Sequence, residues 1–196
     1  LRPSLRGDRS GFHVSPRRAP EKRGAAVRLV FAGDLSAVAN RAPPRIDAEL
    51  QALFRGADLT VLNCESPVVS RVDAPFGTLI GIRHAMSAGF LADVLGAAAI
   101  EPGRAVLSVA NNHALDQGDA GLEASLEAIA GLGAHAVGLT DHDRPPIIAA
   151  GGLTVSFDAF SRWHNAPREE FAAKIRTAPH ASDDPRQDDG ADRAVD

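Results

Sequence analysis

Three polar clusters in this chain each follow a short apolar run, and their side chains are of types that bind metal ions. The clusters are Asp34, then Asn63 with Glu65, and then Asn111, Asn112 and His113. Carboxylate, carboxamide and imidazole groups form a ligand set that suits Mn²⁺, Mg²⁺, Fe or Zn²⁺ better than copper(I) or an iron–sulfur cluster. Such sites polarise a phosphoryl oxygen and activate water. A histidine beside the metal can also donate a proton to a leaving alkoxide.

Each cluster also has an ordinary structural interpretation. Side chains two residues apart in an extended chain point to the same side. Asn63 and Glu65 can therefore converge, while Cys64 faces the other way, into packing. Taken alone, however, a polar strand end commonly caps a neighbouring helix, and Gly33-Asp34 is a frequent turn after a strand. A lone, partly buried histidine is equally ordinary, so only the three clusters together favour a metal site.

The apolar patterns predict the elements that would position these clusters. Strands are expected over 27–33, 58–63, 105–110 and 135–139, helices over 45–57, 87–98 and 118–133, and two strands joined by a Gly-Gly turn over 147–157. Strands that alternate with helices indicate βαβ units and a largely parallel sheet, which is an α/β fold. Because ligands gather at the carboxyl ends of parallel strands, we expect the polar clusters to meet at one edge of the sheet.

Length and composition exclude several classes of protein. The chain has 196 residues, which fits one domain, and its net charge of −4 gives no reason to expect a nucleic-acid partner. No apolar run approaches 18 residues, so the sequence predicts no membrane-spanning helix. Cys64 is the single cysteine, which excludes an internal disulfide and a thiolate-rich metal site. The sequence also lacks the usual nucleotide-binding fingerprints and a G-x-S-x-G elbow.

The chain divides into three predicted segments. Residues 1–26 are basic and lack the apolar stretch of a secretory signal, so we expect a disordered lead-in. Residues 27–178 are expected to form the ordered domain. Residues 179–196 are acidic and without periodicity, which predicts a disordered tail.

Three segments carry a resemblance to a known family: VRLVFAGDLS, ADLTVLNCESPV and LSVANNHALDQGDAGLEASLEAIAGLGAHAVG. In order, spacing and flanking residues they resemble the bacterial capsule-synthesis proteins of the CapA type, which are associated with poly-γ-glutamate biosynthesis. The resemblance covers roughly residues 27–160, and ANNHALDQG is its most specific part. It implies a fold similar to the calcineurin-like metallophosphoesterases, an α/β sandwich flanked by helices. The chain is expected to hold the N-terminal half of that fold.

The resemblance also implies a role for each candidate residue. Asp34 would be a metal ligand after the first strand, and Glu65, with Asn63 beside it, would take the carboxylate place after the second. Asn112 would match the metal-binding Asn of the phosphoesterase Asn-His pair, and His113 its catalytic histidine. The implied cofactor is a divalent metal ion. The implied partners are an anionic polymer or phosphoester substrate and capsule-assembly proteins.

The chain departs from the family pattern at several places. Asn111 stands where those enzymes usually carry Gly, and Ser36 where a typical phosphoesterase has His. The later His-Trp-Gly and Gly-His-x-His segments, which complete the metal shell, are missing, although 161–165 reads SRWHN. An alternative is therefore a non-catalytic truncated or binding component of a polymer synthesis or export assembly. The resemblance implies the cell envelope as location, whereas a chain complete as given would be cytoplasmic.

Several polar residues are expected to play no part in chemistry. Asp116 and Gly118 would shape the turn into the following helix. Arg83 and His84 could help to hold an anionic substrate, but a solvated loop is the favoured interpretation. The segment 141–143 reads DHD and precedes two prolines, which predicts a solvated turn.

Overall fold

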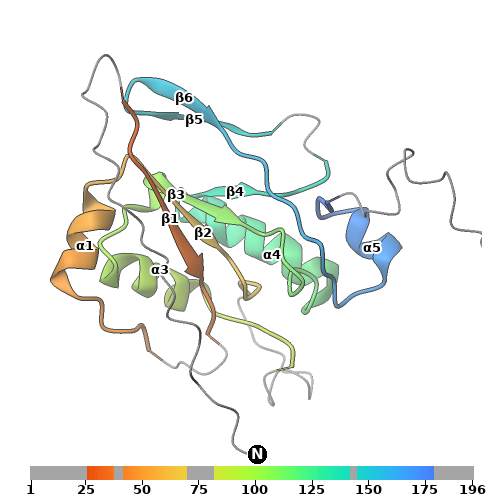
Figure 1. The fold of residues 1–196 in the computed structure, drawn as a ribbon. Helices are drawn as coiled ribbons and strands as arrows, with labels where there is room; N and C mark the ends of the chain where they lie inside the picture. The colour runs from red at the N-terminus through yellow and green to blue at the C-terminus, as the bar shows by residue number, and fades with distance from the viewer. Residues whose placement is uncertain (1–25, 38–41, 70–81, 142–144, 179–196) are drawn as a thin grey trace, which may run out of the picture.

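The computed structural model describes residues 26–37, 42–69, 82–141 and 145–178 (Figure 1). The predicted lead-in and tail therefore lie outside the described residues, apart from Ala26, as do His142 and Asp143 of the DHD segment. The elements in chain order are β1 (Leu29–Asp34), α1 (Ala48–Arg55), β2 (Leu59–Asn63), α3 (Ala88–Ala97), a 3-10 turn (Pro102–Arg104), β3 (Ala105–Ser108), α4 (Gly118–Gly131), β4 (His135–Val137), β5 (Ile147–Ala150), β6 (Leu153–Ser156) and α5 (Arg168–Ala172). Every predicted strand and helix is present, and among the described residues α5 and the 3-10 turn are the elements that were not predicted.

The four strands β1 to β4 form one parallel sheet in the order β1-β2-β3-β4. Helix α1 lies between β1 and β2 in the chain, α3 between β2 and β3, and α4 between β3 and β4. The predicted βαβ architecture is therefore confirmed. All four strands present their carboxyl ends at the same edge of the sheet.

Alternation of side chains along the strands gives the sheet two buried faces. Leu62 and Leu107 pack on one face with apolar residues of α1, α3 and α4. Leu59 and Val106 point to the other face and pack against Ile148 of the antiparallel β5–β6 hairpin. Figure 1 shows α1, α3 and α4 on one side of the sheet and the hairpin on the other. The fold is thus the α/β sandwich that was expected, with a two-stranded second sheet.

Local signals explain where two of the helices begin. Asp47 precedes α1, and its carboxylate accepts a hydrogen bond of 2.7 Å from the backbone N–H of Leu50. Ser87 caps α3 in the same way, through the N–H of Phe90 at 3.0 Å. Such caps satisfy one of the backbone donors that a helix start leaves free. None of the helices in the described part of the chain is long and apolar enough to cross a membrane.

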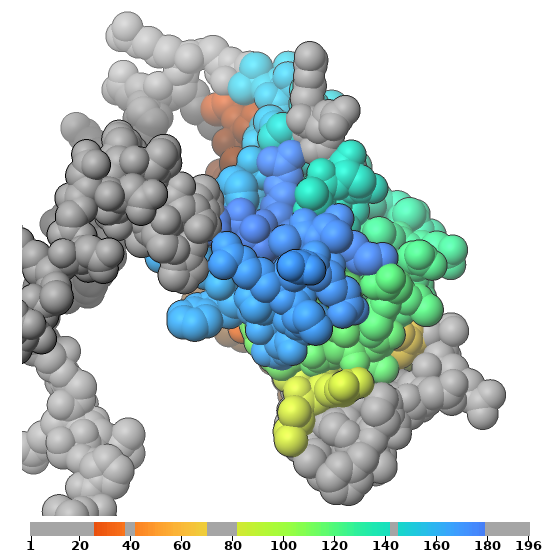
Figure 2. Space-filling view, turned by 90° about the vertical axis from the view of Figure 1, so that its right-hand side faces the viewer, coloured from red at the N-terminus to blue at the C-terminus, as the bar shows by residue number. Residues whose placement is uncertain are grey.

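The segment after β6 returns to the carboxyl edge of the sheet. Thr140 N–H donates to the carbonyl of Lys174 and Arg176 N–H donates to that of Gly138, each at 2.9 Å. Phe171 of α5 and Ile175 are fully buried and pack this segment against the core. Figure 2 shows the segment, in blue, lying against the green surface formed by the middle of the chain.

Candidate metal centre

The ends of β1 and β2 bring Asp34, Asn63 and Glu65 together. A register shift between Phe31 and Asp34 inserts one extra residue into β1, so that Asp34 stands opposite Asn63. The Asn63 side chain donates from Nδ2 to Asp34 Oδ1 at 2.9 Å and to Glu65 Oε2. Cys64 points the opposite way and is buried, as alternation along an extended chain predicts.

The environment of Glu65 disfavours its charge. Burial is the largest effect that raises the pKa of Glu65, and the negative charges of Asp34 and Asp116 raise it further. The hydrogen bond from Asn63 and the nearby His113 act in the opposite direction. A half-buried carboxylate beside further carboxylates is a place where a cation would be stabilised.

His113 lies between this carboxylate edge and a second acidic residue. Its Nδ1 is 2.6 Å from Asp116 Oδ2, and its Nε2 is 3.7 Å from Glu65 Oε1. An ionised carboxylate can only accept, so His113 Nδ1 carries the hydrogen and Nε2 faces Glu65. Asp116 therefore orients the imidazole, which goes beyond the turn-shaping role expected from the sequence.

His84 stacks on His113, and this corrects the expectation of a solvated loop. The two rings are parallel within 4° and their centroids are 3.5 Å apart. The backbone N–H of His84 donates to Asp116 Oδ2 at 2.6 Å, which holds the segment in place. Arg83, by contrast, is exposed. His84 is therefore part of the centre although its neighbour is a surface residue.

The nitrogen atoms of His84 provide the clearest test of whether a metal ion fits here. Its Nδ1 is buried and has no hydrogen bond to any described residue, which is uncommon for a buried polar atom. Burial, followed by the charge of His113, lowers the pKa of His84, so the ring favours its neutral, metal-binding form. Ligand atoms of Glu65, His84 and His113 all lie within 4.8 Å of one another. This oxygen and nitrogen set fits a divalent ion such as Zn²⁺, Mn²⁺ or Fe²⁺.

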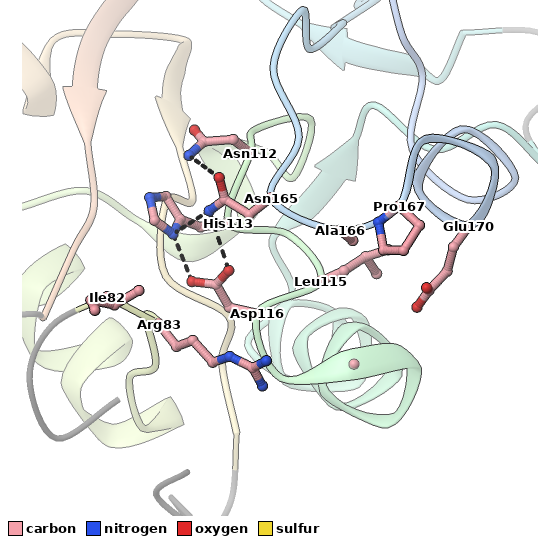
Figure 3. Close-up of a pocket in the computed structure, with 11 residues that line it drawn as sticks. Ile82, Arg83, Asn112, His113, Leu115, Asp116, Asn165, Ala166, Pro167 and Glu170 are labelled. Carbon is pink, nitrogen blue, oxygen red and sulfur yellow. Dashed lines mark hydrogen bonds and ion pairs between the residues drawn. The ribbon is translucent and has the colours of Figure 1, made fainter. Parts of the chain in front are cut away.

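Asn112 contacts a residue of the later SRWHN segment. Its Nδ2 donates to Asn165 Oδ1 at 3.3 Å, and its carbonyl accepts from the N–H of Asn165. Asn165 Nδ2 lies 3.4 Å from Asp116 Oδ1 (Figure 3). The SRWHN segment thus reaches the centre through its last residue.

A cleft of about 670 Å³ opens beside these side chains. His113, Asp116 and Asn165 form part of its wall, and Figure 3 shows Arg83 and Glu170 on opposite sides of them. The side-chain nitrogens of Arg83 make no hydrogen bond or ion pair with a described residue, so this cation is available to a ligand in the cleft. The space is large enough for a small anionic group and part of the molecule that carries it.

Three residues of the centre were missed by the sequence analysis: His84, Asp116 and Asn165. Asp116 follows His113 by three residues in the most specific motif, and this spacing was a signal that could have identified it. His84 and Asn165 lie far from that motif in the chain and only the fold brings them to it.

Comparison with protein families identifies the chain. The sequence profile described as bacterial capsule synthesis protein PGA_cap matches residues 28–195, and members of that family have a metallophosphoesterase-like fold. A comparison with curated proteins gave no match. The match spans most of the chain and includes every residue of the centre described above. The chain therefore belongs to the PGA_cap family of bacterial capsule synthesis proteins.

Proposed function

We propose that the carboxyl edge of the sheet is a divalent-cation site that hydrolyses a phosphoester in capsule synthesis. The observation that carries this proposal is the convergence of Glu65, His84 and His113, whose ligand atoms lie within 4.8 Å of one another. Asp34 adds a second carboxylate at this edge, held to Glu65 through Asn63. The ligand atoms of Glu65 and His84 are close enough to share a single ion, so the expected stoichiometry is one cation per chain.

The proposed ligands are Asp34, Glu65 and His84. Asn63 faces the two carboxylates with its NH₂ group and directs its oxygen to Asn111, so it is not assigned as a ligand. Asn112 is joined to Asn165 through its Nδ2. When bound, the cation supplies Lewis-acid polarisation of a phosphoryl oxygen. The membership in a capsule-synthesis family supports an anionic polymer or its phosphoester precursor as substrate.

His113 is the proposed proton donor to the oxygen of the leaving group. Asp116 holds the Nδ1–H of this imidazole at 2.6 Å, which leaves Nε2 to carry and deliver the proton. Asp116 also stabilises the protonated ring, because its carboxylate lies against Nδ1. The side chain of Asp116 is only 4% exposed, so water weakens this interaction little.

Arg83 is the proposed contact for the anionic group of the substrate. It lines the same cleft as His113 and Asp116 and is exposed. A guanidinium recognises phosphate or carboxylate through paired hydrogen bonds. Arg83→Gln should therefore raise KM for an anionic ester and change kcat little.

Metal binding and hydrolysis are tested separately. The chelator-treated protein is titrated with Mn²⁺ and Zn²⁺ by calorimetry, and Glu65→Gln and His84→Gln should each weaken binding by at least about tenfold. Glu101→Gln and His135→Gln are the matched controls, because Glu101 is exposed and pairs with Arg104, and the ring of His135 contacts the carbonyl of Gly103. Equal affinity in all four variants and the parent would refute the site.

The role of His113 has its own outcome. His113→Gln should abolish hydrolysis of a chromogenic phosphomonoester or phosphodiester while cation affinity stays within about threefold of the parent. A loss of affinity as large as that of Glu65→Gln would make His113 a ligand and overturn its assignment as proton donor. A parent that binds the cation and hydrolyses neither ester would overturn the proposed reaction.

A further inference from the structure

Two amide side chains in series connect the turn at His113 with the carboxylates at the ends of β1 and β2. Asn111 is buried, with 6% of its surface exposed. Its Oδ1 accepts from the backbone N–H of His113 at 3.0 Å, and its Nδ2 donates to Asn63 Oδ1 at 3.1 Å and to the carbonyl of Cys64 at 2.9 Å. Asn63 in turn donates to the two carboxylates.

The chemistry of the groups at the two ends of this chain fixes the direction of both amides. At one end a backbone N–H can only donate, so it requires the oxygen of Asn111. The NH₂ group of Asn111 must then face Asn63, whose oxygen receives it. At the other end Asp34 Oδ1 and Glu65 Oε2 are the acceptors, and the NH₂ group of Asn63 faces them. Reversing either amide would set donor against donor or acceptor against acceptor, which costs the buried groups their hydrogen bonds.

We propose that Asn111 and Asn63 form an oriented amide relay, in which Asn111 fixes Asn63 as a donor that positions Asp34 and Glu65. Asn63 is then a positioning residue of the centre and not an oxygen ligand. The relay joins the turn that carries His113 to the strand end that carries Glu65. Asn111 stands where the phosphoesterases usually carry a glycine, and a glycine has no side chain that could fix the orientation of Asn63.

The relay determines which carboxylate oxygens remain for a cation. Asn63 engages Asp34 Oδ1 and Glu65 Oε2, so the oxygens it does not contact are Asp34 Oδ2 and Glu65 Oε1. Glu65 Oε1 is the atom that faces His113 Nε2 at 3.7 Å. The NH₂ group also offsets the repulsion between two neighbouring carboxylates when no cation is present.

This inference concerns the site of the proposed function, but its test needs neither metal nor substrate. In ¹⁵N-labelled protein with chelator, the side-chain NH₂ signals of Asn63 are identified by their loss in Asn63→Asp. Asn111→Asp keeps the acceptor for the N–H of His113 and removes the donor to Asn63. Its matched control is Asn112→Asp, the same change of charge on the next residue, whose side chain contacts Asn165.

The relay predicts that Asn111→Asp moves the Asn63 NH₂ signals toward the positions of solvent-exposed amides, whereas Asn112→Asp leaves them in place. Glu65→Gln should move them as well, because it removes the charge that one N–H faces. Asn63 signals that stay unmoved in Asn111→Asp, or that move equally in Asn112→Asp, would overturn the relay. A protein that shows the expected shifts but binds no cation would refute only the proposed function.

A second measurement applies if Asn111→Asp does not fold. Asn63→Asp can still accept from Asn111 but places a third carboxylate against Asp34 and Glu65. Its Tm without metal should fall by at least about 4 °C at low ionic strength and by less at high salt, which screens the repulsion. The expected fall has two sources, the hydrogen bonds that Asp34 and Glu65 lose and the negative charge that is added beside them. A Tm equal to or above that of the parent would therefore overturn the assignment of Asn63 as a donor.

Discussion

Asp116 is the acceptor on which both imidazoles of the centre depend, and its replacement tests that dependence. Its Oδ2 lies 2.6 Å from the backbone nitrogen of His84 and 2.6 Å from Nδ1 of His113. Leaving a buried donor without its acceptor costs about 1–3 kcal/mol, and Asp116→Ala leaves two donors without theirs. We therefore expect the free energy of unfolding to fall by about 2–6 kcal/mol.

The isosteric change Asp116→Asn separates the shape of this acceptor from its charge. The amide oxygen can still receive both donors, but the bonds are no longer assisted by charge. Such bonds weaken from about 1.5–3 to about 0.5–1.5 kcal/mol, so the loss should be smaller than in Asp116→Ala, about 1–3 kcal/mol. Hydrolysis should fall in both variants, because neither stabilises a protonated His113.

Urea unfolding followed by circular dichroism measures these losses, with Asp119→Ala as control. Asp119 stands three residues further along, in the first turn of α4, and is about half exposed where it pairs with Lys174 at 2.7 Å. An exposed ion pair contributes little to stability. Equal losses in Asp116→Ala and Asp119→Ala would show that the acceptor role of Asp116 has been overestimated.

Four further predictions each concern a single residue. Gly138 has φ +101°, and a Cβ there would lie 2.6 Å from Cβ of Ala110. Gly138→Ala should therefore lower the free energy of unfolding in urea by about 2–5 kcal/mol. Gly131 lies in open space on α4, so Gly131→Ala should raise the free energy of unfolding by about 0.5–1 kcal/mol. Because the pKa of Glu65 is raised, the folded state holds the carboxyl proton of Glu65 more tightly than the unfolded state does. The stability of the metal-free protein should therefore fall as pH rises from 4.5 through the raised pKa. Glu65→Gln should remove this pH dependence. Burial raises the pKa of Cys64 to about 12, so a thiol reagent should react with it only after unfolding, which a colorimetric thiol assay in urea would show.

The strands and helices were predictable because their patterns are local. β3 reads as a continuous apolar run, Ala105–Leu107, and the structure buries it on both faces. The Gly-Gly turn at 151–152 predicted the β5–β6 hairpin, and both glycines have positive φ. The sequence did not say that this hairpin covers the second face of the sheet, because that depends on contacts between Ile148 and residues some 40–90 positions earlier in the chain.

The candidate centre was predictable only in part, for a related reason. Asp34 and Asn63 are the last residues of their strands and Glu65 follows β2, so the topology alone brings them to one edge. The direction of an amide is set by its partners, however, and Asn63 could be assigned as a donor only once Asn111 was in place. His84 belongs to a segment without regular structure, and nothing local to it predicts its stacking on His113.

The SRWHN segment reaches the centre through its asparagine and not through its histidine. His164 turns away from the centre: its Nδ1 is bonded to the carbonyl of Ala166 at 2.8 Å and its ring lies against Phe171. Asn165 reaches the centre instead, and it presents NH₂ hydrogens to Asp116. An amide nitrogen is not a metal ligand, so this segment contributes hydrogen bonds where an imidazole would have contributed coordination. In the proposed site the nitrogen ligand is therefore His84, and a calorimetric stoichiometry of two cations per chain would contradict that site.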